Sequence, residues 1–254
     1  MTRLQSELQR LYLPRSQAHV EDDAQPSALI DPQGMVRAMV MELTRPPSWE
    51  LLSKVWHGVQ AELELPAPAI AVSGDEGLQL WFSLAEPITA SQGQLFLESL
   101  RARFLPDIDA RRILLMPASD ASGQHPERHA RLVPALQQQT GNWSAFVAAD
   151  LAPIFADTPW LDIAPNEEGQ ATLLRGLGTI KPAVFDEALK RLGPTTSADL
   201  SLAPAQSVTA TAEADPKRFL LRVMNDETVA LALRIEAAKA LMHCSDERRP
   251  RQSD

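Results

Sequence analysis

The 254-residue sequence predicts an α+β fold built on an antiparallel sheet, on three observations. Between residues 33 and 117, β-type apolar runs and amphipathic segments follow the order strand, helix, strand, strand, helix, strand. A short glycine-containing turn joins the second and third strands directly, which favours antiparallel pairing. Prolines end several of these segments, and the chain contains 20 prolines against 11 glycines. This order is ferredoxin-like, βαββαβ, with the first and third strands central and both helices on one face.

Turn and capping residues delimit the first strand and helix. Residues 36–44 form a β-type run that follows Gly34 and ends before Pro46. Ser48 is placed to cap the next segment, where apolar side chains recur at helical spacing as far as Leu63. We therefore expect a strand followed by a helix.

The stretch VSGDEGLQLWFSL predicts a hairpin between the second and third strands. Its turn spans Ser73 to Gly77. Side chains of a strand alternate between the two faces of a sheet. The set expected to meet the helices is Leu78, Leu80, Phe82 and Leu84. The set expected on the opposite face is Gln79, Trp81 and Ser83. If the two central strands are neighbours, Glu42 of the first strand can lie on that face with Gln79 and Trp81.

The rest of the domain is expected to contain one more strand and several helices. A helix over 89–104 ends before Pro106, and a fourth strand ends at Pro117. Three later segments have helical patterns and are expected to be short helices packed on the sheet domain: 142–161, 167–180 and 182–193. The sheet face opposite the first two helices is then either open or covered by added elements.

Composition divides the chain into five parts. They are an N-terminal extension (1–32), the ferredoxin-like domain with its added C-terminal helices (33–192), a flexible linker rich in Ala, Ser, Thr and Pro (193–215), a tethered helical hairpin (216–243) and a disordered tail (244–254). The small hairpin needs a partner surface, because it cannot bury enough apolar area alone.

Charge and cysteine content exclude several classes of protein. The net charge of −9 argues against a broad basic surface that coats nucleic acid. No run approaches the ~20 apolar residues of a membrane span, so no membrane partner is expected. The single cysteine, Cys244, excludes an internal disulfide and any cluster of cysteine ligands. A cytoplasmic protein is the expectation.

Several polar residues fall at positions that resemble a known family. The pattern consists of an acidic residue on the first strand, a Ser-Gly hairpin, a further acidic position, then arginine and a proline-ended strand. This pattern is similar to the core of archaeo-eukaryotic primases and primase-polymerases. The resemblance covers residues 36–117. The matching residues are Glu42, Ser73, Gly74, Gly77, Leu78, Gln79, Asp107 or Asp109, Arg111 and Arg112.

The resemblance implies a divalent cation at Glu42 together with Asp107 or Asp109. It also implies contacts to DNA, RNA or a nucleotide. The residues that would make these contacts are Ser73, Gly74, Gln79, Trp81, Arg111 and Arg112.

Two positions depart from the family's pattern. The family's metal site needs a second carboxylate two residues after the first, where this chain has Thr44, and Gln79 stands where the family has histidine. An amide forms hydrogen bonds but carries no positive charge. The resemblance therefore implies that the polymerase chemistry has been lost.

The leading hypothesis is a non-catalytic relative of the primase fold that binds nucleic acid or nucleotide in a replication or mobile-element context. The alternative is a protein-interaction or self-association module without nucleic-acid contact, acting through residues 216–242, which resemble a phage terminase small-subunit-like or HEAT-type segment. An active nucleotidyltransferase ranks last. The residues also allow structural interpretations: the Ser73–Gly77 segment as a plain turn, and Trp81 as a side chain packed under a helix.

Overall fold

The structure, a computed structural model, describes residues 1–14, 29–118 and 129–193. The chain divides into two compact units, residues 1–196 and 197–254. The predicted hairpin at 216–243 and the tail at 244–254 lie outside the described residues, as does the predicted linker beyond Gly193. None of the described helices is long and apolar enough to cross a bilayer.

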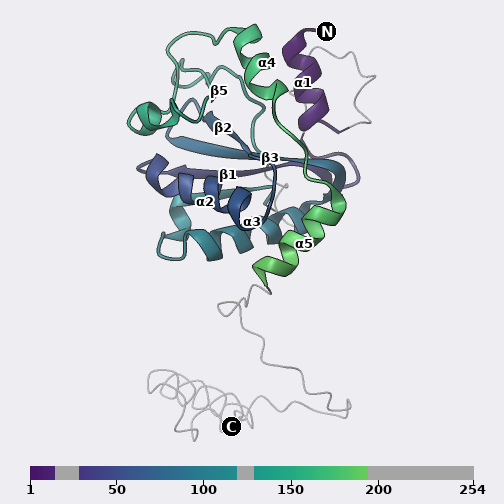
Figure 1. Ribbon diagram of the computed structural model, residues 1–254. Coiled ribbons are helices and arrows are strands. Elements are labelled where there is room, and N and C mark those ends of the chain that lie inside the picture. Colours follow the sequence, from purple (N-terminus) through teal and green to yellow (C-terminus); the bar gives the residue numbers. More distant parts are fainter. Residues whose placement is uncertain (15–28, 119–128, 194–254) are drawn as a thin grey trace, which may run out of the picture. The chain divides into compact units, whose positions relative to one another are not determined.

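A five-stranded antiparallel sheet forms the centre of the first unit (Figure 1). Its strands are β1 (Met35–Thr44), β2 (Ala69–Val72), β3 (Gly77–Thr89), β4 (Ile113–Met116) and β5 (Ala145–Val147). The spatial order is β4-β1-β3-β2-β5, and all neighbouring pairs are antiparallel. The predicted α+β class with an antiparallel sheet is confirmed.

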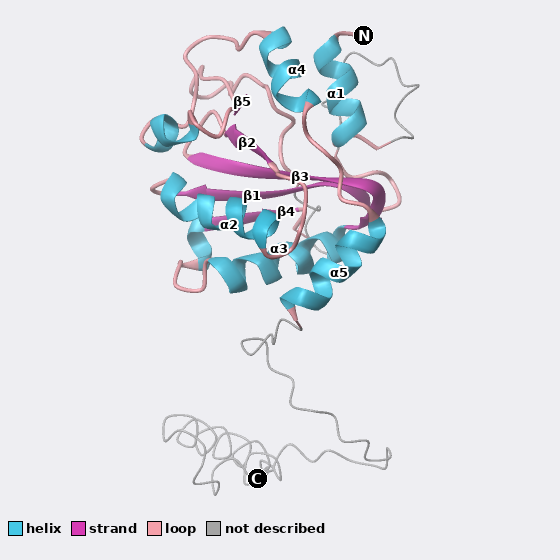
Figure 2. Ribbon diagram, in the orientation of Figure 1, coloured by secondary structure: helices cyan, strands magenta, loops and turns pink. Residues whose placement is uncertain are grey.

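Helices α2 (Trp49–Ala61), α3 (Ala90–Phe104) and α5 (Pro182–Leu192) cover one face of the sheet (Figure 2). The Ser48 hydroxyl caps α2 and the Thr89 hydroxyl caps α3, each by accepting a backbone N–H of the first turn. The apolar set of β3 faces these helices, as predicted. Phe82, for example, meets the Phe96 ring edge-on with 6.0 Å between centroids.

Helices α1 (Arg3–Leu11) and α4 (Glu167–Arg175) lie over the opposite face (Figure 2). Leu4, Leu8 and Leu11 of α1 are buried, and the helix contacts α4. Of the two possibilities that the sequence left for this face, the structure therefore has the covered one.

Arg37 of β1 links the end of α1 to the sheet. The residue is only 4% exposed, and its guanidinium donates to the carbonyls of Gln9 (3.2 Å), Arg10 (2.8 Å), Leu13 (3.0 Å) and Leu84 (3.2 Å). The last carbonyls of a helix have no partners within the helix and attract positive charge. One buried cation thus satisfies the end of α1 and fixes its position.

The structure corrects the helix predicted over 142–161. This segment contains strand β5, which pairs with β2, and a short 3-10 helix, η3 (Ala152–Ala156). The other edge of β5 is closed by Gln170 of α4, whose side-chain amide accepts from Phe146 N (2.7 Å) and donates to Phe146 O (2.9 Å). The segment forms a strand despite its local helical pattern, because β2 pairs with its backbone on one edge and the Gln170 amide does so on the other.

Candidate functional site

Three side chains of the central strands form a hydrogen-bonded chain on the second face. The Trp81 indole N–H donates to Gln79 Oε1 at 2.8 Å, and Gln79 Nε2 donates to Glu42 Oε2 at 3.0 Å. Glu42 on β1 lies directly opposite Gln79 on β3. All three are buried, between 1% and 9% exposed. The prediction that they share a face is confirmed, and their polar atoms bind one another.

The β2–β3 hairpin also satisfies its own polar groups. Ser73 Oγ accepts the backbone N–H of Asp75 (3.2 Å) and of Gly77 (2.9 Å). The Gly74 N–H, at a residue with φ of +81°, donates to the Pro159 carbonyl at 3.0 Å. Clustered backbone N–H groups in a turn are the donors that a phosphate group would need. Here these three already have partners within the protein.

A segment between β4 and β5 packs on this hairpin, and no sequence pattern predicted that contact. Gln137 Nε2 donates to the Ser73 carbonyl at 2.9 Å, and the Thr140 hydroxyl lies 3.5 Å from the Gly74 carbonyl. These two residues lie between the predicted fourth strand and the segment 142–161, where the sequence predicts no helix or strand. No spacing or residue pattern there indicates which strand it contacts.

Trp81 belongs to a cluster of three aromatic rings. The Tyr12 ring meets the indole edge-on with 5.2 Å between centroids, and Phe146 meets it edge-on at 5.8 Å. Tyr12 and Phe146 stack on each other at 6.0 Å. With the indole 1% exposed, no face of Trp81 is free to stack on a base. Tyr12, which directly follows α1, and Phe146 of β5 cover the indole.

Glu42 lies in surroundings that disfavour its charged form. Burial raises the pKa of this carboxyl, the hydrogen bonds from Gln79 and Ser73 act in the opposite direction, and the nearby Asp75 charge raises the pKa further. The side chain also lies directly over Gly77. A Cβ atom there would overlap the Glu42 side chain, so any other residue at this position would have to displace that carboxyl.

The carboxylates implied as cation ligands are not gathered into one group. Asp109 accepts the backbone N–H of Arg111 at 2.9 Å and caps the short 3-10 helix η2 (Ala110–Arg112). Within the described ranges, no three His, Cys, Asp or Glu residues are placed to hold a metal ion. Glu42, Asp107 and Asp109 therefore do not form a site of three carboxylates, and a cation at Glu42 with one of the two aspartates stays a prediction.

The two predicted arginine contacts lie beside the end of β1 and differ in their surroundings. Arg112 is half-buried and donates to the carbonyls of Pro46 (2.8 Å) and Thr44 (3.4 Å). Arg111 is exposed. A further exposed arginine, Arg45, forms an ion pair with Glu76 of the hairpin. This end of the sheet therefore presents guanidinium groups to solvent next to the Glu42 network.

Comparison with known proteins finds structural similarity, and this similarity is weak. No family model and no curated protein sequence matches this chain. Among solved structures, the AEP domain of cyanophage S-2L primase-polymerase (PrimPol) is similar over 56% of this chain and 61% of that chain, with 14% identity and a TM-score of 0.27. The match spans less than two thirds of that domain.

Proposed function

We propose that this protein is a non-catalytic domain related to the primase fold that binds nucleic acid or nucleotide through its exposed arginines. The observation that carries the first part is the chain from Trp81 through Gln79 to Glu42. A carboxylate that holds a catalytic cation must be ionised and accessible. Glu42 is buried, hydrogen-bonded to an amide and held at a raised pKa.

The connectivity supports a ferredoxin-like core. The strand order β4-β1-β3-β2, with α2 joining β1 to β2 and α3 joining β3 to β4, is the order expected for βαββαβ. In this interpretation β5, α1, α4 and α5 are additions to that core. The rings that cover Trp81 come from Tyr12, which directly follows α1, and from Phe146 of β5.

The proposed contact surface is the end of the sheet that carries Arg111, Arg112 and Arg45. Arginine recognises phosphate oxygens through its planar set of donors. Arg112 also holds the Pro46 segment, so we assign the contact chiefly to the exposed Arg111. Because the chain is acidic overall, binding through this small basic area should be weak and sensitive to salt.

Catalysis is tested with a metal-dependent primer-synthesis assay on the full chain, with Mg²⁺ and with Mn²⁺. The expected result is no product. Product that is lost in Glu42→Ala but kept in Asp186→Ala, an exposed carboxylate on α5, would overturn the non-catalytic assignment.

Binding is tested by fluorescence anisotropy with labelled single-stranded DNA, duplex DNA, RNA and a nucleoside triphosphate. Each is measured at about 50 mM and about 200 mM salt. Arg111→Glu should weaken binding severalfold, and more strongly at the lower salt concentration. Lys190→Glu on α5 is the control with the same change of charge. Absence of binding at low salt, or equal loss in both variants, rejects the proposed contact.

A further inference from the structure

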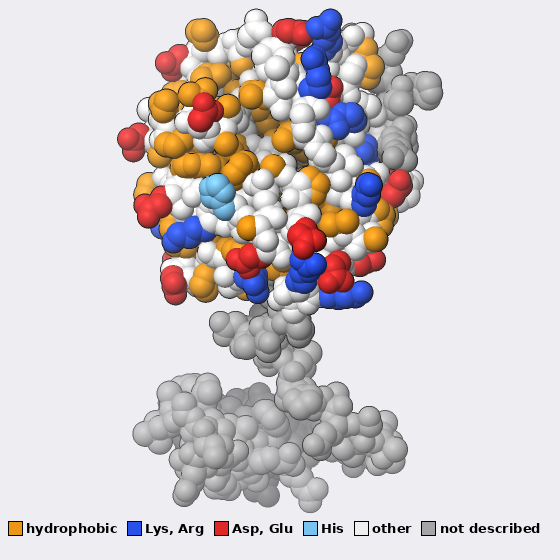
Figure 3. All heavy atoms as spheres, viewed as in Figure 1, with side chains coloured by type: hydrophobic (Ala, Val, Ile, Leu, Met, Phe, Trp, Pro, Cys, Tyr) orange, Lys and Arg blue, Asp and Glu red, His pale blue; other side chains and the backbone are white. Residues whose placement is uncertain are grey.

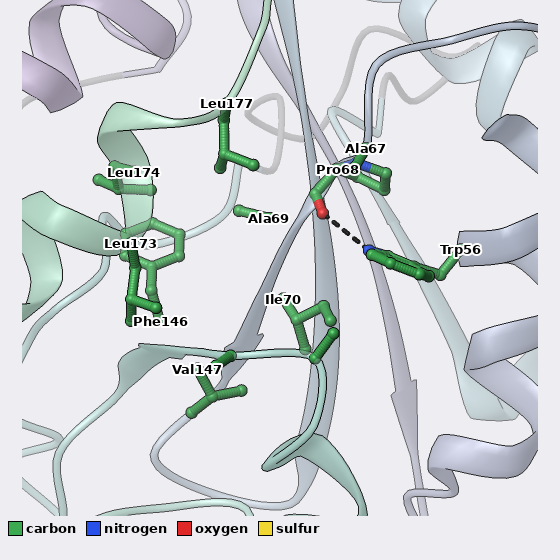
Figure 4. A pocket seen from close by; sticks show the side chains of 12 residues that line it. Trp56, Ala67, Pro68, Ala69, Ile70, Phe146, Val147, Leu173, Leu174 and Leu177 are labelled. Atoms are coloured by element: carbon green, nitrogen blue, oxygen red, sulfur yellow. Dashed lines mark hydrogen bonds between the residues drawn. The ribbon is translucent and has the colours of Figure 1, made fainter.

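An apolar groove lies where β2 and β5 meet α2 and α4 (Figure 4). Its volume is about 200 Å³. Trp56, Pro68 and Ile70 form one wall, and Phe146, Val147 and Leu173 form the other. The Trp56 indole N–H already donates to the Pro68 carbonyl at 3.1 Å. The lining side chains thus offer van der Waals contact alone, and the size suits one large apolar side chain better than a drug-sized molecule.

The apolar surface continues beyond the groove. Two exposed side chains follow the lining residue Ala149 in the chain: Leu151, 46% exposed, and Ile154, 69% exposed. On the visible face, Figure 3 shows hydrophobic side chains gathered over this region around a hollow, with acidic side chains at the margin. An apolar area of this kind with a charged rim is typical of a protein-binding surface.

The charge around the groove indicates the kind of partner. The segment 132–174 supplies one wall and contains no Lys, Arg or His. Its charged residues are all acidic and all exposed: Asp150, Asp157, Asp162, Glu167 and Glu168. Of these, Glu168 forms an ion pair with Arg3 of α1, and Arg10 of α1 donates to the carbonyls of the lining residues Leu174 and Leu177. The free acidic charge is therefore that of the other four residues. Asp150 directly follows Ala149. A second copy of this chain would bring like charges together, whereas a partner with basic flanks would meet opposite charge.

The hydrogen bonding of β5 restricts how a partner can bind. Strand addition needs free N–H and C=O groups along an exposed edge. At Phe146 both outward groups are taken by the Gln170 amide, and the Ser144 N–H donates to the Ala135 carbonyl at 2.9 Å. Recognition here therefore depends on side chains inserted into the groove.

We propose that this groove docks a segment of another protein that inserts an aliphatic or aromatic side chain flanked by Lys or Arg. The groove supplies the apolar contact, and Asp150 with its acidic neighbours selects the basic flanks. This site is separate from the Glu42 network and from the arginines assigned to nucleic acid. Its test can succeed or fail independently of the proposed function.

The test pans a random peptide library displayed on phage against the full chain. Enriched peptides should carry a large apolar residue with Lys or Arg on either side. A fluorescein-labelled synthetic peptide of the enriched sequence should lose affinity about tenfold or more for Ala149→Arg. Asp150→Lys should cause a smaller loss that shrinks with added salt. The control with the same charge change is Asp186→Lys on α5, which should bind normally.

Circular dichroism melting confirms that each variant is folded, and Leu177→Lys on the groove wall replaces Ala149→Arg if the latter unfolds. Three outcomes overturn the proposal. The first is no enrichment. The second is enrichment of peptides without basic flanks, or of peptides that bind the groove variant equally well. The third is self-association in sedimentation experiments that Ala149→Arg abolishes, which would make a second copy the occupant.

Discussion

The two faces of the central sheet are stabilised by different kinds of contact. The face under α2, α3 and α5 buries mainly aliphatic and aromatic side chains, whose attraction has little directional preference. The face under α1 and α4 buries Arg37, Glu42 and Gln79 among its apolar side chains. Arg37 donates to backbone carbonyls, and Gln79 donates to Glu42. In the described part of the chain, every buried side-chain nitrogen and oxygen has a partner.

This difference teaches which face fixes the added elements in one position. An apolar core accepts side chains of similar volume at small cost. A buried polar group left without its partner costs far more. Substitutions of similar size should therefore be tolerated on the first face and destabilising on the second, and the following variants test that contrast from the largest effect to the smallest.

Arg37→Met should give the largest effect. It leaves the carbonyls at the end of α1 without a donor. Because each buried polar group left unsatisfied costs about 1–3 kcal/mol, the free energy of unfolding should fall by about 3–5 kcal/mol, measured by urea denaturation. Leu80→Met, on the first face, is the matched control and should cost less than about 1.5 kcal/mol. Equal costs for the two variants would contradict the contrast between the faces.

Gln170→Leu should be the next most destabilising. It removes both hydrogen bonds to the Phe146 backbone and leaves a buried strand edge unsatisfied, at a cost of about 2–4 kcal/mol in urea denaturation. Thr172→Val, on the exposed side of the same helix, should change stability by no more than about 0.5 kcal/mol. If the two variants denature alike, the amide does not hold β5.

Glu42→Gln should change the pH dependence of stability. Because burial raises the Glu42 pKa above the unfolded value near 4.3, the folded state binds the proton more tightly. The carboxyl's contribution is therefore fully present below the unfolded pKa and is lost as pH rises through the folded pKa. The melting temperature of Glu42→Gln minus that of wild type should therefore be more positive at pH 8 than at pH 4. A difference in melting temperature that does not vary with pH would refute this.

Arg45→Gln should have the smallest effect. The ion pair of Arg45 with Glu76 is exposed, with 79% and 51% of the two side chains accessible. Solvent screens such pairs, so the variant should leave the melting temperature nearly unchanged, and the small difference should shrink further in high salt. Thermal melts at two salt concentrations measure this. A loss as large as that of Gln170→Leu would show that burial does not separate the strong polar contacts from the weak ones.

The elements that the sequence predicted well are those with a strong local pattern. Ser48 at the start of α2, the Ser73–Gly77 turn and the alternation along β3 are determined within a few residues, and all three were predicted. Strand β5 was missed because its three residues, Ala145–Val147, are set among alanines in a helical pattern. Only β2, far away in the sequence, supplies its pairing.

The candidate site shows the same limit. The sequence placed Glu42, Gln79 and Trp81 on one face through the period of two, and the register of β1 with β3 agrees. It could not show that their polar atoms bind one another, because that depends on side-chain distances. Nor could it show that Tyr12 and Phe146 cover the indole, since those rings come from elements distant in sequence.

The sequence by itself determined the α+β class, the core strands and helices, and the sets of side chains that share a face. The physical reason is that periodicity, caps and turns act between residues close in the chain. The tertiary structure alone decided that the second face is covered, that Arg37 holds α1, and that an apolar groove remains beside β5. These features depend on contacts between distant segments, which no local pattern encodes.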